Sequence, residues 1–168
     1  MKSNMKTALL LLQGFVFGLA ILPVATVAQN NGKETNAMNK LIVSKFVAAI
    51  NEHNVDKICS PMADEHKFID SHGHEVAGKD KMKTAWTGYF EWFPDYKIEV
   101  TDVFADRDTV GAFGFASGTF HGPKAPKENY WRLPASWKAT LKDGKVQLWQ
   151  VYADSKIPFD IINKSKGA

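Results

Sequence analysis

Residues 130–154 read YWRLPASWKATLKDGKVQLWQVYAD, an order of side chains that predicts two paired strands. Apolar residues occupy every second position from Trp131 to Leu141, which places them on one face of the first strand. Lys142, Asp143 and Gly144 supply a tight turn, and residues 145–154 then form the second strand. A hairpin with one apolar face needs a second layer, so we expect helices to cover that face.

More strands precede this hairpin. Residues 96–101 alternate strictly, and residues 110–121 are rich in Gly, Ala and Phe. Residues 66–70 and 75–77 flank turn residues and predict a short strand pair. Gly111, Gly114 and Gly118 within one strand predict either a sharp bend or the close approach of another element.

Helical patterns are concentrated early in the chain. Apolar residues recur at three and four between residues 38 and 52, Asn54 suits the N-cap of a helix over 55–60, and an aromatic stripe from residue 80 ends at Pro94. Early helices and late strands predict an α+β domain over residues 37–168. We expect three N-terminal helices packed on a strongly curved antiparallel sheet.

The N-terminus has the three-part order of an export signal. Residues 1–28 carry Lys2 and Lys6, then an apolar run, then small residues at 26–28, which predicts cleavage and export to the periplasm or the medium. An uncleaved membrane anchor is the alternative interpretation. Residues 29–36 are polar and predict a disordered linker.

Charge and cysteine content limit the function classes. Loss of Lys2 and Lys6 lowers the formal net charge from +3 to +1, so we expect neither a nucleic-acid partner nor a membrane partner after cleavage. Cys59 is the only cysteine, which excludes an intramolecular disulfide. We expect it to be a buried core residue rather than a catalytic thiol.

Several stretches in register resemble the nuclear transport factor 2-like superfamily, in its SnoaL-like branch of polyketide cyclases and ketosteroid isomerase-like proteins. The matching stretches are KFVAAIN at 45–51, MAD at 62–64, FIDSHG at 68–73, GKD at 78–80, FPD at 93–95, GTFHG at 118–122 and DGKV at 143–146, continued by Trp149, Tyr152 and Asp154. This resemblance covers about residues 41–160. It implies a cone-shaped fold that encloses a small-molecule pocket, and a homodimer formed through the sheet.

Asp70 is the first candidate for chemistry. It shares strand parity with Phe68, so an apolar face carries a carboxylate inward, and we expect burial to raise the pKa of this group toward that of a general base. The resemblance also places Asp70 where ketosteroid isomerase-like members carry their proton-abstracting aspartate. The alternative is that Asp70 caps the turn over residues 70–73.

At the other positions where the resemblance implies catalytic residues of isomerases and cyclases, this chain carries different residue types. Phe46 stands where the resemblance implies a catalytic tyrosine, and residues 130–142 contain no acid for an oxyanion hole. Gln150 follows Trp149 where SnoaL-like cyclases carry an aspartate. Asp154, four residues on, either enters the pocket or caps the strand end.

Histidines add a second kind of candidate. His72 and His74 are two residues apart and could supply two metal ligands, and His66 precedes them. A metal site needs at least three such groups to converge, and this spacing is a weak signal of it. We therefore expect no metal and no cofactor. We expect His121, at the end of the Gly-rich strand, to act as a pocket acid or hydrogen-bond donor.

These interpretations define one candidate site. The predicted catalytic residues are Asp70, His121, Tyr152 and Asp154. The predicted ligand-binding residues are Phe68, His72, Trp86, Tyr89, Phe90, Phe113, Trp131, Trp137, Trp149 and Gln150. So many aromatic rings predict an apolar or aromatic small molecule as ligand. Acid/base catalysis of isomerase, cyclase or dehydratase type is one hypothesis, with Asp70 as base, and a non-catalytic ligand-binding or dimeric scaffold domain is the other.

Overall fold

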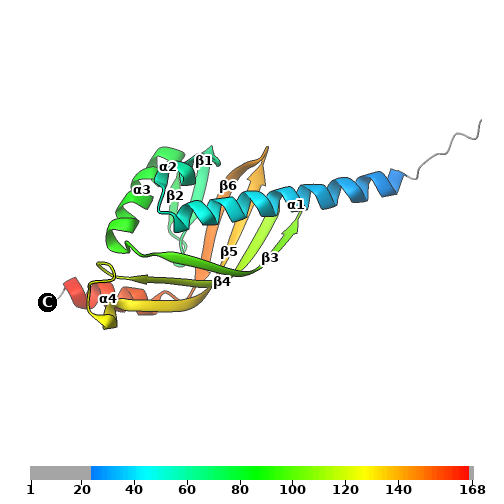
Figure 1. The fold of residues 1–168 in the computed structure, drawn as a ribbon. Helices are drawn as coiled ribbons and strands as arrows, with labels where there is room; N and C mark the ends of the chain where they lie inside the picture. Colours follow the sequence, from blue (N-terminus) through cyan, green and yellow to red (C-terminus); the bar gives the residue numbers. More distant parts are fainter. Residues whose placement is uncertain (1–23, 167–168) are drawn as a thin grey trace, which may run out of the picture.

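The computed structural model describes the backbone of residues 24–166 and the side chains of residues 31–165 (Figure 1). Its helices are α1 (Val24–Asn51), α2 (Val55–Cys59), α3 (Lys79–Trp92) and α4 (Lys156–Lys166), with a 3-10 turn η1 (Lys127–Asn129). Its strands are β1 (Met62–Ile69), β2 (Glu75–Ala77), β3 (Lys97–Asp106), β4 (Thr109–Thr119), β5 (Tyr130–Lys142) and β6 (Lys145–Ala153). The predicted export signal falls mainly on residues 1–23, outside the described residues. Among the helices of the described part, none is both long and apolar enough to cross a membrane.

One six-stranded sheet has the order β2-β1-β6-β5-β4-β3. The predicted meander from β3 to β6 is confirmed and antiparallel throughout. The prediction of a wholly antiparallel sheet is wrong, because β1 runs parallel to β6, with Phe68 opposite Trp149. A parallel pair needs a long crossover, which α3 and the other strands supply here. The strong curvature of the sheet stays a prediction.

The core lies between α1 and the inner face of the sheet. Trp137 of β5 and Trp149 of β6 stack at 6.3 Å between ring centroids, and Phe46 of α1 meets the Trp149 ring edge-on at 5.2 Å. All three side chains are fully buried, each worth about 1.5–3 kcal/mol or more of hydrophobic stabilisation. Phe46 therefore anchors α1 on the sheet, which α1 crosses in Figure 1.

Helix α1 is longer than the predicted helix. It begins at Val24 and includes residues 29–36, for which the polar composition predicted a disordered linker. Long-range hydrogen bonds account for the difference: Asn36 Oδ1 accepts from Arg107 N at 2.8 Å, and Asn39 Nδ2 donates to Arg107 O at 2.6 Å. Arg107 sits in the β3–β4 turn with a φ of 54°, so polar helix residues hold a strained turn.

Shorter elements follow the predictions closely. Asn54 caps α2, since its side chain accepts from Lys57 N at 2.9 Å, and Cys59 is buried at the end of that helix. Helix α4 was not predicted from the sequence. It starts where Asp154 Oδ1 accepts from Lys156 N at 3.0 Å, and it buries Ile162.

Gly114 marks the place where two strands come closest. It lies in β4 opposite a register shift in β3 between Val100 and Asp102. A Cβ atom at this position would stand 1.9 Å from the carbonyl oxygen of Glu99. The close neighbour at this glycine is strand β3 at an irregularity, not a helix, and backbone rather than a flexible side chain blocks any larger residue.

We predict that Gly114→Ala destabilises the fold, by about 1–3 kcal/mol or more, because the strands must separate to admit the methyl group. Gly88→Ala is the matched control, since Gly88 lies inside α3 with nothing within 4 Å of its added Cβ. That control should stabilise by roughly 0.5–1 kcal/mol. Urea denaturation of both variants measures the difference, and equal stability of the two would contradict the contact.

Candidate functional site

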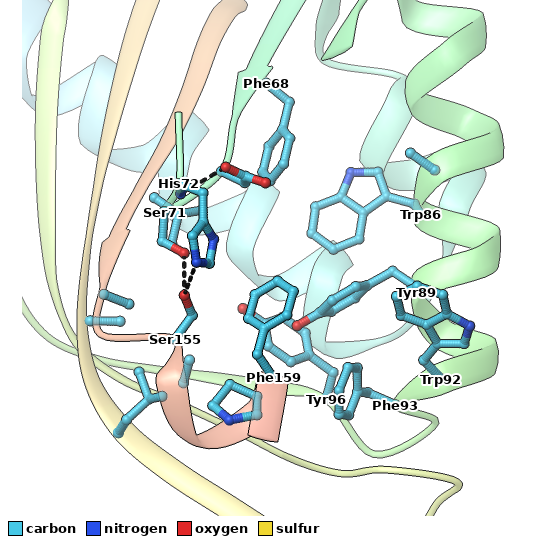
Figure 2. A pocket seen from close by; sticks show the side chains of 18 of the residues that line it. Phe68, Ser71, His72, Trp86, Tyr89, Trp92, Phe93, Tyr96, Ser155 and Phe159 are labelled. Atoms are coloured by element: carbon cyan, nitrogen blue, oxygen red, sulfur yellow. Dashed lines mark hydrogen bonds between the residues drawn. The ribbon is translucent and has the colours of Figure 1, made fainter. Parts of the chain in front are cut away.

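A cavity of about 300 Å³ opens between α3, α4 and the inner face of the sheet (Figure 2). Small side chains make room for it on three adjacent strands: Ala116 of β4, Ala135 of β5 and Ala153 of β6 all line it. Aromatic side chains form much of the remaining wall. These are Phe68, Trp86, Tyr89, Trp92, Phe93, Tyr96, Trp131, Trp149 and Phe159.

Three pairs of neighbouring rings in this wall meet nearly at right angles, whereas Tyr89–Phe93 and Tyr96–Trp131 are tilted at 46° and 43°. Trp86 and Tyr89 lie 6.0 Å apart at 88°, and Tyr89 and Tyr96 lie 5.0 Å apart at 85°. Phe93 meets Trp131 at 5.5 Å and 90°. Trp86, Tyr89 and Phe93 recur at helical spacing at and just after α3, so one helix face delivers them together. Edge-to-face contacts of this kind are favourable and hold each ring in place.

Two hydroxyl groups belong to this apolar wall. Among the described residues, neither Tyr89 nor Tyr96 has a hydrogen-bond partner for its phenol oxygen, and Figure 2 shows Tyr89 extending from α3 into the cavity. Burial raises the pKa of both phenols well above the usual 10.0. Both therefore stay neutral and can donate or accept a hydrogen bond.

A polar cluster stands on another side of the cavity. Ser71 Oγ donates to Ser155 Oγ at 2.8 Å, and His72 Nε2 lies 3.5 Å from the same Ser155 oxygen (Figure 2). Ser71 follows β1 and Ser155 follows β6. Because these strands are parallel, their carboxyl ends reach the same edge of the sheet, and the serines meet there.

Asp70 lines the cavity, but its carboxylate is occupied by the turn. Asp70 Oδ1 accepts from His72 N at 2.8 Å and His74 N at 2.9 Å, and Oδ2 accepts from His74 Nδ1 at 3.1 Å. Partial burial acts to raise the pKa of Asp70, but these hydrogen bonds outweigh it and lower the pKa. The predicted rise in pKa is wrong, and the turn-capping alternative describes the geometry.

Other predicted residues divide between the cavity and the rest of the molecule. The cavity brings together Phe68, Asp70, His72, Trp86, Tyr89, Trp131 and Trp149. It does not include the other three predicted catalytic residues. His121 lies in a turn after β4 with its ring on Phe120, Tyr152 is half exposed, and Asp154 caps α4.

Four predicted ligand-binding residues also lie elsewhere. Phe90 stacks on His53 at 4.4 Å, Trp137 belongs to the core, and Gln150 does not reach the cavity. Phe113 is 47% exposed and packs against Phe104 instead. In β4 the small residues face inward and the large rings outward, whereas we predicted that the rings would face the ligand.

Several lining residues have no counterpart in the prediction. The polar and aromatic ones are Ser71, Trp92, Phe93, Tyr96, Ser155 and Phe159. Ser155 and Phe159 were missed together with α4. Asp154 before a run with Ile157, Ile161 and Ile162 is a helix-start signal followed by helical spacing, and could have revealed both.

His66 is fully buried in β1 and lies outside the cavity lining. Its Nδ1 donates to Val146 O at 2.8 Å, and its Nε2 has no partner among the described residues. Burial lowers the pKa of the His66 imidazole below the usual 6.5, although the Val146 hydrogen bond opposes this. The ring centroids of His72 and His74 lie 6.2 Å apart. Within the described chain, no three His, Cys, Asp or Glu side chains converge as a metal site.

We predict that NMR titration finds the pKa of Asp70 below its ordinary 3.8. His74→Ala should raise it, because the side-chain hydrogen bond and the imidazole charge are lost, while His121→Ala, outside the cavity, should leave it unchanged. A wild-type value above 3.8 would restore the expectation of a general base.

We predict that acid destabilises the fold through His66. The unfolded imidazole takes up a proton below about pH 6.5 while the folded one resists it, so the free energy of unfolding falls as the pH drops below that value. His66→Asn should show a shallower fall between about pH 7 and 5 than the wild type. His121→Asn, at an exposed site, is the control. Identical slopes in all three proteins would rule out this role.

Solved structures with the same fold are similar to this chain in shape rather than in sequence. A provisionally assigned SnoaL-like polyketide cyclase from Jannaschia sp. CCS1 is 20% identical with a TM-score of 0.64, over 74% of this chain and 94% of that one. An LEH-like epoxide hydrolase from M. tuberculosis is 15% identical with a TM-score of 0.64, over 79% and 95%. A hypothetical protein of ketosteroid isomerase-like fold from Catenulispora acidiphila, in complex with trimethylamine, is 15% identical with a TM-score of 0.59, over 66% and 83%.

A sequence search of curated proteins gives no match. The family comparison is decisive where pairwise identity is low. The model of the SnoaL-like domain matches residues 43–149, from the buried face of α1 to the strand that carries Trp149. The expected resemblance is thereby confirmed, and the chain belongs to the SnoaL-like domain family with a nuclear transport factor 2-like fold.

Proposed function

We propose that this protein binds an apolar or aromatic small molecule in the cavity between α3, α4 and the sheet. The observation that carries the proposal is the void itself, about 300 Å³ in volume, which persists although large rings surround it. Protein interiors are normally close-packed. A space of this size with a largely apolar and aromatic lining is therefore better explained as a ligand-binding pocket than as a packing defect.

The wall supports an apolar body with few polar groups. Alanines from three strands make its floor and rings make its sides, so most of a bound molecule's surface would leave water for apolar contact. The Tyr89 and Tyr96 hydroxyls and the Ser71–Ser155 pair offer hydrogen bonds at separate places. These few groups would orient the ligand.

Binding is favoured over proton abstraction by Asp70. A base needs a free lone pair and a pKa matched to its task, whereas Asp70 accepts three hydrogen bonds that lower its pKa. His72 supports a second candidate, acid/base catalysis, because its imidazole lines the cavity 3.5 Å from Ser155 Oγ. Imidazole is the side chain best suited to exchange protons near neutral pH.

Neighbours of the same fold favour binding of small molecules without naming one for this chain. One of them is a hydrolase and another was solved in complex with trimethylamine, so proteins of this fold differ in their chemistry. We carry over only the use of the cavity. The strongly curved, cone-like sheet that the family resemblance implies would suit this use.

We also propose that the protein is exported after cleavage of residues 1–28 and forms a homodimer through its outer sheet face, with no role for nucleic acid or membrane. Phe104, Phe113, Tyr130 and Tyr152 are exposed, each by about half or more of its surface. Large exposed rings on one sheet favour burial against a second copy.

We predict that the neutral fluorophore N-phenyl-1-naphthylamine binds the purified protein with increased emission, since its rings would leave water for the cavity. Ala153→Leu should abolish this binding because the added carbons occupy the void. Ala48→Leu, on the exposed face of α1, is the matched control and should bind like the wild type. Unchanged binding to Ala153→Leu would show that the fluorophore sits elsewhere.

A further inference from the structure

The charges around the cavity are all of one sign. Among the described residues, Asp70 is the only carboxylate that lines it, and no Lys or Arg lines it. The chain as a whole carries a formal net charge of +3, so this local balance differs from that of the protein. Three hydrogen bonds keep the Asp70 carboxylate ionised. An anionic ligand would meet a negative charge here and no opposite one.

The cavity offers few polar groups to a cation, but its aromatic rings can attract one. A cation is attracted to the face of a Trp, Tyr or Phe ring within about 6 Å of its centre, and rings that stand at right angles can surround a cation on several sides. Trp86 and Tyr89 meet at 88°, Tyr89 and Tyr96 at 85°, and Phe93 and Trp131 at 90°. Trp86, Tyr89 and Tyr96 thus form a corner of rings in the cavity wall, and Trp131 is tilted at 43° to Tyr96.

Oxygen atoms complete the surroundings that a cation needs. Tyr89 and Tyr96 have phenol oxygens without partners among the described residues, and both phenols stay neutral. Ser155 Oγ lies on another side of the cavity and already accepts from Ser71. An ammonium group that leaves water could therefore exchange its hydration for ring faces, hydroxyl oxygens and one carboxylate.

We propose that the ligand of this cavity is an organic ammonium ion, held between the rings of Trp86, Tyr89, Tyr96 and Trp131 with Asp70 as its counter-charge. The proposal rests on the proposed binding function and adds the sign of the ligand's charge. Neutral apolar molecules can enter the same space, but the charge of Asp70 adds nothing to their binding affinity. Carboxylates of equal size are excluded.

The test compares ligands that differ in charge and little in shape. Benzyltrimethylammonium and neopentylbenzene are isosteres in which a quaternary nitrogen replaces a quaternary carbon, and phenylacetate supplies the anion. Calorimetric titration is done at pH 8. The ammonium ion should bind about tenfold or more tightly than its carbon isostere, and phenylacetate should not bind.

Variants assign that preference to the cavity. Asp70→Asn should reduce the ammonium-to-isostere affinity ratio by removing the counter-charge, and Tyr89→Leu should reduce it by removing a ring face while keeping the wall apolar. The ratio corrects for general damage to the cavity, because both ligands need the same space. Phe104→Leu, an exposed ring outside the cavity, should leave the ratio unchanged.

The outcomes distinguish failure of the charge assignment from failure of the proposed binding function. If neopentylbenzene binds as tightly as the ammonium ion, or phenylacetate binds, the charge assignment is overturned and the binding function stands. If none of the three ligands binds and N-phenyl-1-naphthylamine fails as well, both proposals fall. An unchanged ratio in Asp70→Asn and Tyr89→Leu also overturns the assignment, whatever the wild-type affinities.

Discussion

The parallel pairing of β1 with β6 is the contact on which the cavity depends. It places Phe68 beside Trp149 and brings the carboxyl ends of both strands to one edge of the sheet. Ser71 and Ser155 meet at that edge, 2.8 Å apart, and α4 begins immediately after Ser155. An antiparallel β1 would carry the turn with Asp70 and His72 to the opposite edge. The polar cluster and the helix that closes the cavity would then lie on different sides of the molecule.

The sheet and the helices contribute different kinds of side chain to the cavity wall. The inner sheet face offers alanines at the cavity, while Trp86 and Tyr89 of α3 and Tyr96 after it brace one another edge-to-face. A void costs the contacts that its lining atoms would otherwise make. The fully buried stack of Trp137 and Trp149, beneath Phe46 of α1, supplies packing elsewhere that offsets this loss. Phe46 and Trp137 thus belong to the core alone, whereas Trp149 takes part in both the core stack and the cavity wall.

Much of the fold was predictable because it follows from local patterns. Asn54 before α2, Pro94 after α3 and the alternation in β5 each act within a few residues, and their elements match the predicted ones to within about two residues. Pairing between distant segments was not predictable in this way. Polar residues 29–36 read as a linker because nothing local reveals that Asn36 holds the turn at Arg107.

The site was predicted in part, and its errors have physical causes. Phe68, Trp86, Tyr89 and Trp131 line the cavity as predicted, but Phe113 and Tyr152 face outward. Both sheet faces carry aromatic residues here, so alternation alone does not say which face is inner. The rise in the pKa of Asp70 was predicted from burial, whereas the turn-capping alternative describes the hydrogen bonds that lower this pKa. Its three donors depend on a turn geometry that composition does not specify.

The central claim is that the space between α3, α4 and the sheet is open to a guest. Crystals of the protein pressurised with xenon test it most directly, because xenon enters dry apolar cavities without needing a specific hydrogen bond. The account predicts xenon density enclosed by Trp86, Tyr89 and Trp131, with these rings unmoved. A structure in which the same rings have closed on one another, leaving no xenon site among them, would contradict it.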